Sequence, residues 1–291
     1  MKKLYQLVFD RFLFVPRAPE SLALFRIILC LGCLSLSVVA YGYVFQVKTG
    51  LPWRPIGVFN LLDGPIDPES LQILFKVWIA LLVLVLFGLF TRISTIFLFI
   101  VFTFMIGHPN NFGMVNHNSN MLIIVLFVMC FSRWGDVISL DQKIFKIKAK
   151  EKSWHYGWPL AMAILIAVFS MFTLGVQKFY FQGLNWALSD GFYISLFLNK
   201  SKPPLTQFIL DSPVWFSMIL AFFSLVVVEL LAPLALLRKF SLVYPLIWAS
   251  FHFTVTLTLG GHRMFWTQIF IYSAFYLVFF DTRISKFFRA Q

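Results

Sequence analysis

Eight long apolar stretches follow one another along the chain, and they constrain the fold more than any other feature of the sequence. A helix that crosses the hydrocarbon core of a bilayer needs about 20 mostly apolar residues. The stretches cover residues 22–44, 70–90, 92–107, 118–132, 157–180, 214–237, 241–259 and 264–280. Hydrophobic residues make up 60% of the chain and charged residues 12%, a composition typical of membrane proteins. The sequence therefore predicts an all-α integral membrane protein, a single domain over residues 1–291 built as a bundle of about eight transmembrane helices.

Basic residues collect in every second connection between these stretches. They precede the first stretch and follow the second, fourth, sixth and eighth: Lys2, Lys3, Arg11, Arg17, Arg92, Arg133, Lys143, Lys146, Lys148, Lys150, Lys152, Arg238, Lys239, Arg283, Lys286 and Arg289. Cytoplasmic loops carry such an excess, so we expect both termini in the cytoplasm and the chain in a cell membrane, such as a bacterial inner membrane. The net charge of +12 follows from this bias and predicts contact with the anionic headgroups of membrane lipids rather than with nucleic acid.

The connections on the opposite side hold most of the residues that could form a site. Three of the five histidines lie there: His108, His117 and His262. Together these connections also hold most of the Asn, Gly and Pro residues of the chain. Acidic residues such as Asp67 stand among turn formers and are expected to serve in turns. We therefore expect any site to open outward.

Two ionisable residues lie inside the predicted spans, where a charge is costly. Glu229 must be paired or protonated, and it could be a structural hydrogen-bond anchor between helices or a proton-handling group. His252 could be an interhelical hydrogen-bonding group or a functional base. At a rise of about 1.5 Å per residue, Glu229 should lie about 23 Å and His252 about 10 Å below the outer face. The sequence therefore does not predict that these two residues touch.

Lys178 lies near the outer end of the fifth predicted span. A lysine there could extend to the lipid headgroups, or it could be a base, because an apolar pocket favours the neutral amine. Ser170, Thr173 and Gln177 form a polar stripe on this span, which indicates a wet or hydrogen-bonded interior on that side. Lys178 lies about 100° around the helix from Gln177, beside the stripe.

Cys30 and Cys33 have the C-x-x-C spacing of thiol–disulfide chemistry, which raises the alternative of a quinone-linked thiol exchanger. Both lie well inside the first predicted span, and Cys130 lies in a different span. Small apolar packing is therefore the favoured interpretation of these cysteines. The histidines show no spacing typical of a metal site, so no metal is predicted.

Four short segments, in order along the chain, resemble the membrane domain of vitamin K-dependent gamma-carboxylases. They are LALFRIILCLG (22–32), NHNSNML (116–122), TLGVQKF (173–179) and ASFHFTVTLTLGGHRMFW (249–266). The resemblance identifies the chain with the HTTM family. That family's carboxylases continue into a large extracytoplasmic region that binds the protein substrate, whereas the printed sequence ends at Gln291, so the similarity is to a short form.

The resemblance implies a base, a ligand class and a set of supporting residues. Lys178 aligns with the second lysine of the family's G-V-K-K segment, which deprotonates vitamin K hydroquinone before a glutamate is carboxylated, and Gln177 replaces the first lysine. The expected catalytic residues are Lys178 and His252. The expected contacts of a quinol-like ligand are His117, Asn118, Gln177, Glu229 and His262. The alternative function is a non-enzymatic membrane component for maturation, export or assembly of a secreted peptide or protein.

Overall fold

The structure is a computed structural model that describes residues 12–44, 52–112, 119–149, 151–198, 203–259 and 262–290. Side chains are described in these ranges except at 36–44, 204, 259 and 262–267. Within this part of the chain the regular structure is helical, apart from one isolated bridge between Arg17 and Ser153. The prediction of an all-helical chain is confirmed for the described residues.

A helix lies in each of the eight predicted stretches. The long helices are α2 (Pro19–Val44), α3 (Pro68–Phe87), α4 (Thr91–Gly107), α5 (Asn120–Met129), α7 (Trp154–Gln182), α11 (Val214–Phe223), α12 (Val243–Leu259) and α13 (His262–Phe279). Shorter elements are η2 (Gly57–Leu61), η3 (His108–Phe112), α6 (Leu140–Ile144), α8 (Asn185–Leu188), α9 (Gly191–Phe197), α10 (Pro204–Asp211), η4 (Ser224–Leu230), η5 (Ala232–Leu236) and α14 (Asp281–Arg289). By length and composition, three helices of the described part can span a bilayer: α3, α4 together with η3, and α7. The arrangement in eight spans stays a prediction.

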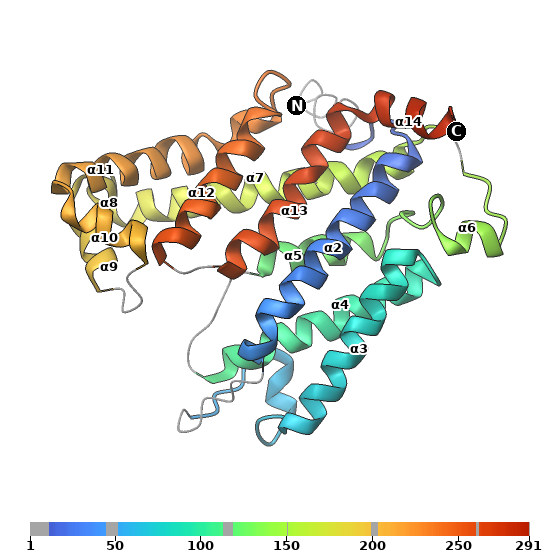
Figure 1. The fold of residues 1–291 in the computed structure, drawn as a ribbon, viewed down its shortest axis with the longest axis horizontal. Coiled ribbons are helices and arrows are strands. Elements are labelled where there is room, and N and C mark those ends of the chain that lie inside the picture. The colour runs from blue at the N-terminus through green and yellow to red at the C-terminus, as the bar shows by residue number, and fades with distance from the viewer. Residues whose placement is uncertain are drawn as a thin grey trace. The chain divides into compact units, whose positions relative to one another are not determined.

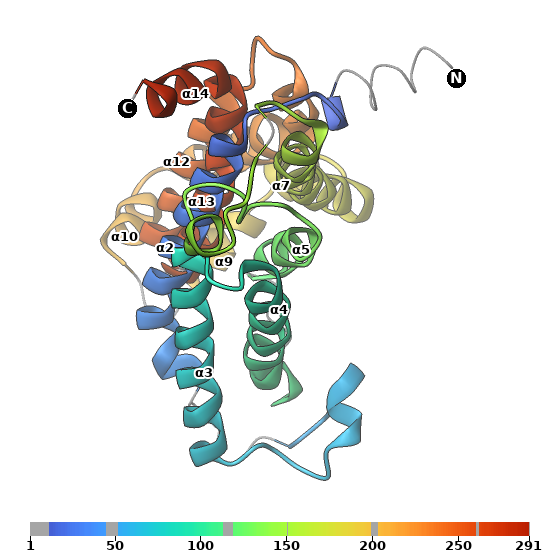
Figure 2. The same cartoon turned by 90° about the vertical axis from the view of Figure 1, so that its right-hand side faces the viewer.

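The chain divides into two compact units, residues 1–163 with 280–291 and residues 164–279, and α7 contributes to both. In the first unit α2 packs against α3, α3 against α4, and α4 against α5 (Figures 1 and 2). Trp78 of α3 is fully buried, and its ring centroid lies 5.4 Å from that of Phe102 of α4. Because lipid tails are as apolar as these side chains, close van der Waals packing rather than escape from water holds such helices together.

Buried polar side chains close the helix ends of the first unit. Asp141 accepts hydrogen bonds of 2.7 Å from the backbone N–H groups of Phe90 and Thr91, at the start of α4. Asp281, at the start of α14, accepts hydrogen bonds from the Ala18 N–H and the Ser21 hydroxyl, which holds α14 against α2. The first N–H groups of a helix have no partner within it, so these carboxylates satisfy donors that would otherwise be buried without one.

The structure agrees with the interpretation of Asp67 as a turn residue and of the three cysteines as packing residues. Asp67 caps α3 by accepting a 2.8 Å hydrogen bond from the Ser70 N–H, as expected of a turn residue. Cys30, Cys33 and Cys130 are free thiols and buried, which fits the packing interpretation.

In the second unit α11 packs against α8 and α9, and α12 packs against α13. Residues 180–213, expected to be an outer connection, contain α8, α9 and α10. These three helices gather around α11, at the C-terminal end of α7 (Figure 1). The apolar run that follows α11 is not a regular α-helix: it passes into the π-helical element η4 and the 3₁₀ element η5. The sixth predicted span is therefore interrupted near Glu229.

Replacement of Asp141 by alanine is expected to lower the free energy of unfolding by about 2 kcal/mol, because it leaves two backbone donors and the Thr91 hydroxyl without an acceptor. Thermal unfolding of the purified protein in detergent measures the effect. Asp63→Ala, which removes an exposed carboxylate, is the control and should change stability by less than about 0.5 kcal/mol. Equal unfolding temperatures for Asp141→Ala and the wild type would contradict the capping role.

Candidate functional site

Lys178 and Glu229 form an ion pair in the second unit. The Lys178 Nζ atom lies 2.6 Å from the Oε1 atom of Glu229. The Glu229 side chain is 2% exposed and that of Lys178 27% exposed, so the pair is largely shielded from solvent. Lys178 therefore does not extend freely to lipid headgroups: its ammonium group is held by a carboxylate of a neighbouring element.

Gly175 allows the two elements to come this close. It precedes Lys178 by three residues on α7 and thus lies on the same face. A Cβ atom at position 175 would lie 2.8 Å from the Glu229 Cβ and 3.0 Å from the backbone nitrogen of Leu230. A glycine inside a helix costs about 1 kcal/mol relative to alanine, and this close approach gives a structural reason for it.

The carboxylate of Glu229 lies on the π-helical element η4. Ser224 stands five residues earlier, which is the spacing of one π-helical turn. The second carboxylate oxygen, Oε2, is buried and has no hydrogen-bond partner among the described residues. Single π-helical turns occur frequently at functional sites. Glu229 thus combines one oxygen engaged by Lys178 with one oxygen that can still accept a hydrogen bond.

Trp186 of α8 completes the surroundings of the lysine. The Lys178 Nζ atom lies 4.1 Å from the centroid of the Trp186 ring, which is the geometry of a cation–π contact. The tryptophan lies in the segment that follows α7, only eight residues from the lysine. The ammonium group therefore has an anion and an aromatic face as neighbours.

The pairing of Lys178 with Glu229 could not be obtained by counting helical rise from the ends of the predicted spans. That count treats residues 180–213 as a connection outside the bilayer and starts the sixth span beside the end of the fifth. Instead, α8 and α9 pack along α11, so α11 passes these helices before its continuation η4 meets α7 (Figure 1). Glu229, 15 positions into the predicted sixth span, thus meets Lys178, which lies near the end of α7.

His252 belongs to a second polar group in the same unit. Its Nε2 atom lies 2.9 Å from the hydroxyl oxygen of Tyr272, and this hydroxyl lies 3.3 Å from the Oε1 atom of Gln268. If the tyrosine donates its proton to Gln268, His252 must carry its proton on Nε2 and its Nδ1 atom becomes an acceptor. Nδ1 is buried and has no hydrogen-bond partner in the described part of the chain. This arrangement matches an interhelical hydrogen bond between α12 and α13 and leaves one ring nitrogen available.

Trp248 contacts Tyr272 of the second polar group and the backbone next to Glu229. Its indole N–H donates a 3.0 Å hydrogen bond to the carbonyl oxygen of Val228, the residue before Glu229. Its ring centroid lies 5.3 Å from that of Tyr272. The structure thus brings Lys178 and Glu229 into direct contact, and among the described residues Tyr272 and Trp248 link His252 to the backbone next to Glu229.

Of the remaining predicted site residues, the structure describes the side chain of Gln177, and this side chain does not join the contact. Gln177 is exposed, so the predicted polar stripe does not line the packed side of α7, and its neighbour Lys178 faces η4 instead. The Thr173 hydroxyl is bonded within its own helix to the carbonyl oxygens of Phe169 and Ser170. His117 and Asn118 lie outside the described residues. His262 begins α13, but its side chain is also outside the described part.

Sequence reasoning did not single out Gly175 and Trp186. The signal for Gly175 was available, since a glycine inside an apolar helical run commonly marks a close approach. No comparable signal existed for Trp186, because its role depends on the position of α8.

Replacement of Gly175 by alanine is expected to destabilise the protein by about 1–3 kcal/mol, because the added methyl group collides with Glu229 and the η4 backbone. At an uncrowded helical position the same change would stabilise by about 1 kcal/mol, so the sign of the effect is diagnostic. Thermal unfolding in detergent measures it. Val176→Ala, at the exposed neighbouring position, serves as the control.

A double-mutant cycle extends this test to the ion pair. If Gly175→Ala separates α7 from η4, the additional effect of Lys178→Met should be smaller in the Gly175→Ala background than in the wild type. Equal effects in the two backgrounds would show that Gly175 does not set the distance between Lys178 and Glu229.

Comparisons of the chain with models of protein families, with curated proteins and with solved structures found no match. The resemblance to the gamma-carboxylase membrane domain thus rests on the four short segments quoted above. The chemistry of the site is accordingly inferred from its own residues.

Proposed function

We propose that this protein is a multi-pass membrane protein with both termini in the cytoplasm, in which Lys178 and Glu229 exchange a proton with a hydroquinone-like amphiphile. One observation carries the proposal: the 2.6 Å contact between Nζ of Lys178 and a buried oxygen of Glu229. In a site of low dielectric constant, an ionised pair and a neutral pair of these groups lie closer in free energy than in water, because both charges lose solvation. A proton can therefore move along this hydrogen bond.

Each residue has a defined part in that exchange. With the proton on Glu229, the Lys178 amine is neutral and can act as a base. With the proton on Lys178, the ring of Trp186 and the Glu229 carboxylate stabilise the ammonium group. The balance between the two states depends on what else binds the carboxylate. Lys178 is the candidate catalytic base, and Glu229 holds or returns its proton.

The surroundings of the pair fit a hydroquinone. The Oε2 atom of Glu229, which has no hydrogen-bond partner among the described residues, can accept a hydrogen bond from a phenolic O–H group. Such a ligand, when bound, supplies the acidic O–H group, and in its oxidation to the quinone its two electrons and two protons pass to dissolved O2, which becomes hydrogen peroxide. The family resemblance agrees in assigning the base to Lys178. A secreted peptide or protein as the substrate, and a cell membrane as the location, are part of the same proposal.

A second function, that of a structural scaffold, is favoured by the direct contact between the two charged groups. Direct contact between Lys178 and Glu229 neutralises both charges and ties α7 to η4, which is the work of a structural bridge. In that case the bundle is a scaffold, and the protein acts without catalysis in the maturation, export or assembly of a secreted peptide or protein.

The two functions predict different behaviour of the double variant Lys178→Met with Glu229→Met. Lys178→Met alone leaves a buried carboxylate without its cation and should cost about 3–5 kcal/mol of stability. The double variant replaces both charges by apolar side chains of similar size and should recover most of this loss. Catalysis predicts that the double variant folds but no longer oxidises reduced vitamin K or a menaquinol analogue in air-saturated buffer. Loss of quinol absorbance and thermal unfolding measure the two effects.

The outcomes separate the proposals cleanly. A folded double variant that oxidises the hydroquinone as fast as the wild type removes Lys178 as the base. A wild-type protein that neither binds nor oxidises any hydroquinone removes the catalytic function altogether. The scaffold function then predicts that the double variant still supports export of its peptide partner in cells.

A further inference from the structure

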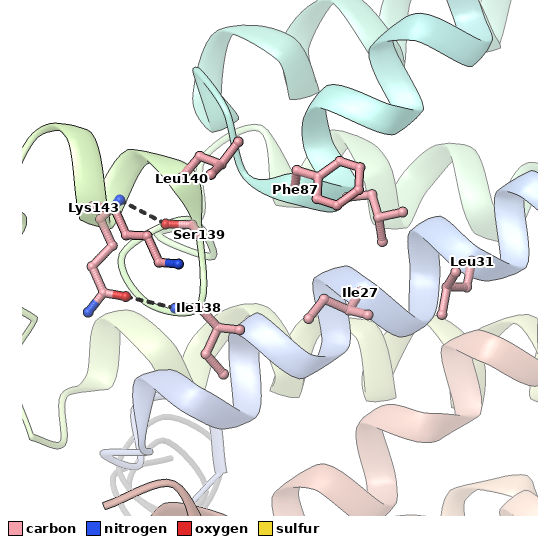
Figure 3. Close-up of a pocket in the computed structure, with 9 residues that line it drawn as sticks. Ile27, Leu31, Phe87, Ile138, Ser139, Leu140 and Lys143 are labelled. Atoms are coloured by element: carbon pink, nitrogen blue, oxygen red, sulfur yellow. Dashed lines mark hydrogen bonds between the residues drawn. The ribbon is translucent and has the colours of Figure 1, made fainter. Parts of the chain in front are cut away.

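An open pocket lies in the first unit, far along the sequence from Lys178 and Glu229. Its volume is about 420 Å³, which is within the range of small-ligand sites. The lining residues come from α2, from the end of α3 and from the segment that leads into α6: Ile27, Leu31, Leu86, Phe87, Ile138, Ser139, Leu140, Gln142 and Lys143. Figure 3 shows Ile27, Leu31 and Phe87 on one side of this space and Lys143 on the other. The pocket thus combines an apolar wall with one cation.

Hydrogen bonds hold the polar wall of the pocket in place. The Gln142 N–H donates to the Ser139 hydroxyl, and the Gln142 side-chain oxygen accepts from the Ile138 N–H, both at 2.9 Å (Figure 3). The Asp141 N–H donates to the carbonyl oxygen of Gly88, at the end of α3. Arg26 of α2 donates to the carbonyl oxygen of Ile138. These contacts satisfy the backbone internally and leave apolar side chains to face the pocket, so the site exists before any ligand enters.

The location of the pocket matches the boundary between hydrocarbon and headgroups. It lies where α3 ends and α4 begins, and both of these helices can span a bilayer by length and composition. Beside it, the exposed apolar side chains of Ile144 and Phe145 lie in sequence between the exposed cations Lys143 and Lys146. A short basic segment with apolar side chains of this kind is typical of the membrane interface.

The charges around the pocket select an anion. Lys143, the lysine among the lining residues, forms no ion pair within the described part of the chain. The one carboxylate of the segment, Asp141, is occupied by three donors from Phe90 and Thr91 at the start of α4. A choline headgroup would find no free carboxylate here, whereas a phosphate with an uncompensated negative charge finds a free ammonium group.

We infer that this pocket binds one anionic phospholipid from the leaflet that the basic segment faces. An acyl chain lies against Ile27, Leu31 and Phe87, and the phosphate group contacts Lys143. A free phosphate ion is a poorer occupant, because the lining is mostly apolar and would leave most of its oxygens without donors.

The inference is tested on the full-length protein, delipidated in detergent and titrated with phosphatidylglycerol or phosphatidylcholine. Native mass spectrometry counts bound lipid, and thermal unfolding reports the stabilisation. One lipid-facing lysine contributes about 1 kcal/mol, which corresponds to about a fivefold change in affinity. We expect phosphatidylglycerol to bind about fivefold more tightly than phosphatidylcholine, and Lys143→Gln to remove this preference. Leu31→Trp, which fills the exposed side of the pocket, should weaken both lipids.

Matched controls make each outcome decisive. Lys148→Gln removes an equally charged, exposed residue outside the pocket and should leave the lipid preference unchanged. Equal effects of Lys143→Gln and Lys148→Gln would indicate general attraction to anionic lipid and overturn the site. Equal binding of the two lipids to the wild type, unchanged binding by Leu31→Trp, or competition by inorganic phosphate at millimolar concentration would overturn it as well. Unfolding curves recorded without lipid verify that each variant is folded.

Discussion

Neither lipid nor an apolar helix interface solvates a charge, so every buried charged side chain of this protein needs a partner within the chain. The described residues include five such side chains: Glu20, Arg26, Asp141, Glu229 and Asp281. Each has one, and the partners are distant in sequence. These contacts fix which helix ends and faces meet, a specificity that apolar packing among so many similar side chains would not supply.

The five charged groups differ in what they can do chemically. In the first unit the acceptors and donors are mostly backbone groups, as for Asp141 at the start of α4 and Arg26 at the carbonyl of Trp134. Such contacts hold structure and exchange no proton with their partner. Glu229 is paired with a group that can itself gain or lose a proton, and it keeps one oxygen without a partner. Lys152 also lies 3.5 Å from Asp281, but it is more exposed than Lys178, so the more enclosed lysine–carboxylate pair of the described residues lies at the contact between α7 and η4.

The basic segment around α6 has a different physical character. The carboxylate of Asp141 accepts hydrogen bonds from the start of α4. It therefore does not neutralise the lysines of this segment, which lie beside an apolar pocket. The same capping contact thus stabilises the start of α4 and gives the neighbouring surface its positive charge. The proposed lipid site and the proposed proton-exchanging pair belong to separate compact units and rest on separate residues.

The sequence by itself determined that the chain is helical and where its apolar helices lie, because length and hydropathy act locally: the predicted stretch 157–180 contains most of α7, which is Trp154–Gln182. It also determined that Glu229 needs a partner. Only the tertiary structure decided that the partner is Lys178, because the depth of Glu229 depends on how α8 and α9 pack along α11. The tertiary structure also decided that Lys178 is partly enclosed whereas its neighbour Gln177 is exposed. The reason is that η4 packs against Gly175, which lies on the same face of α7 as Lys178.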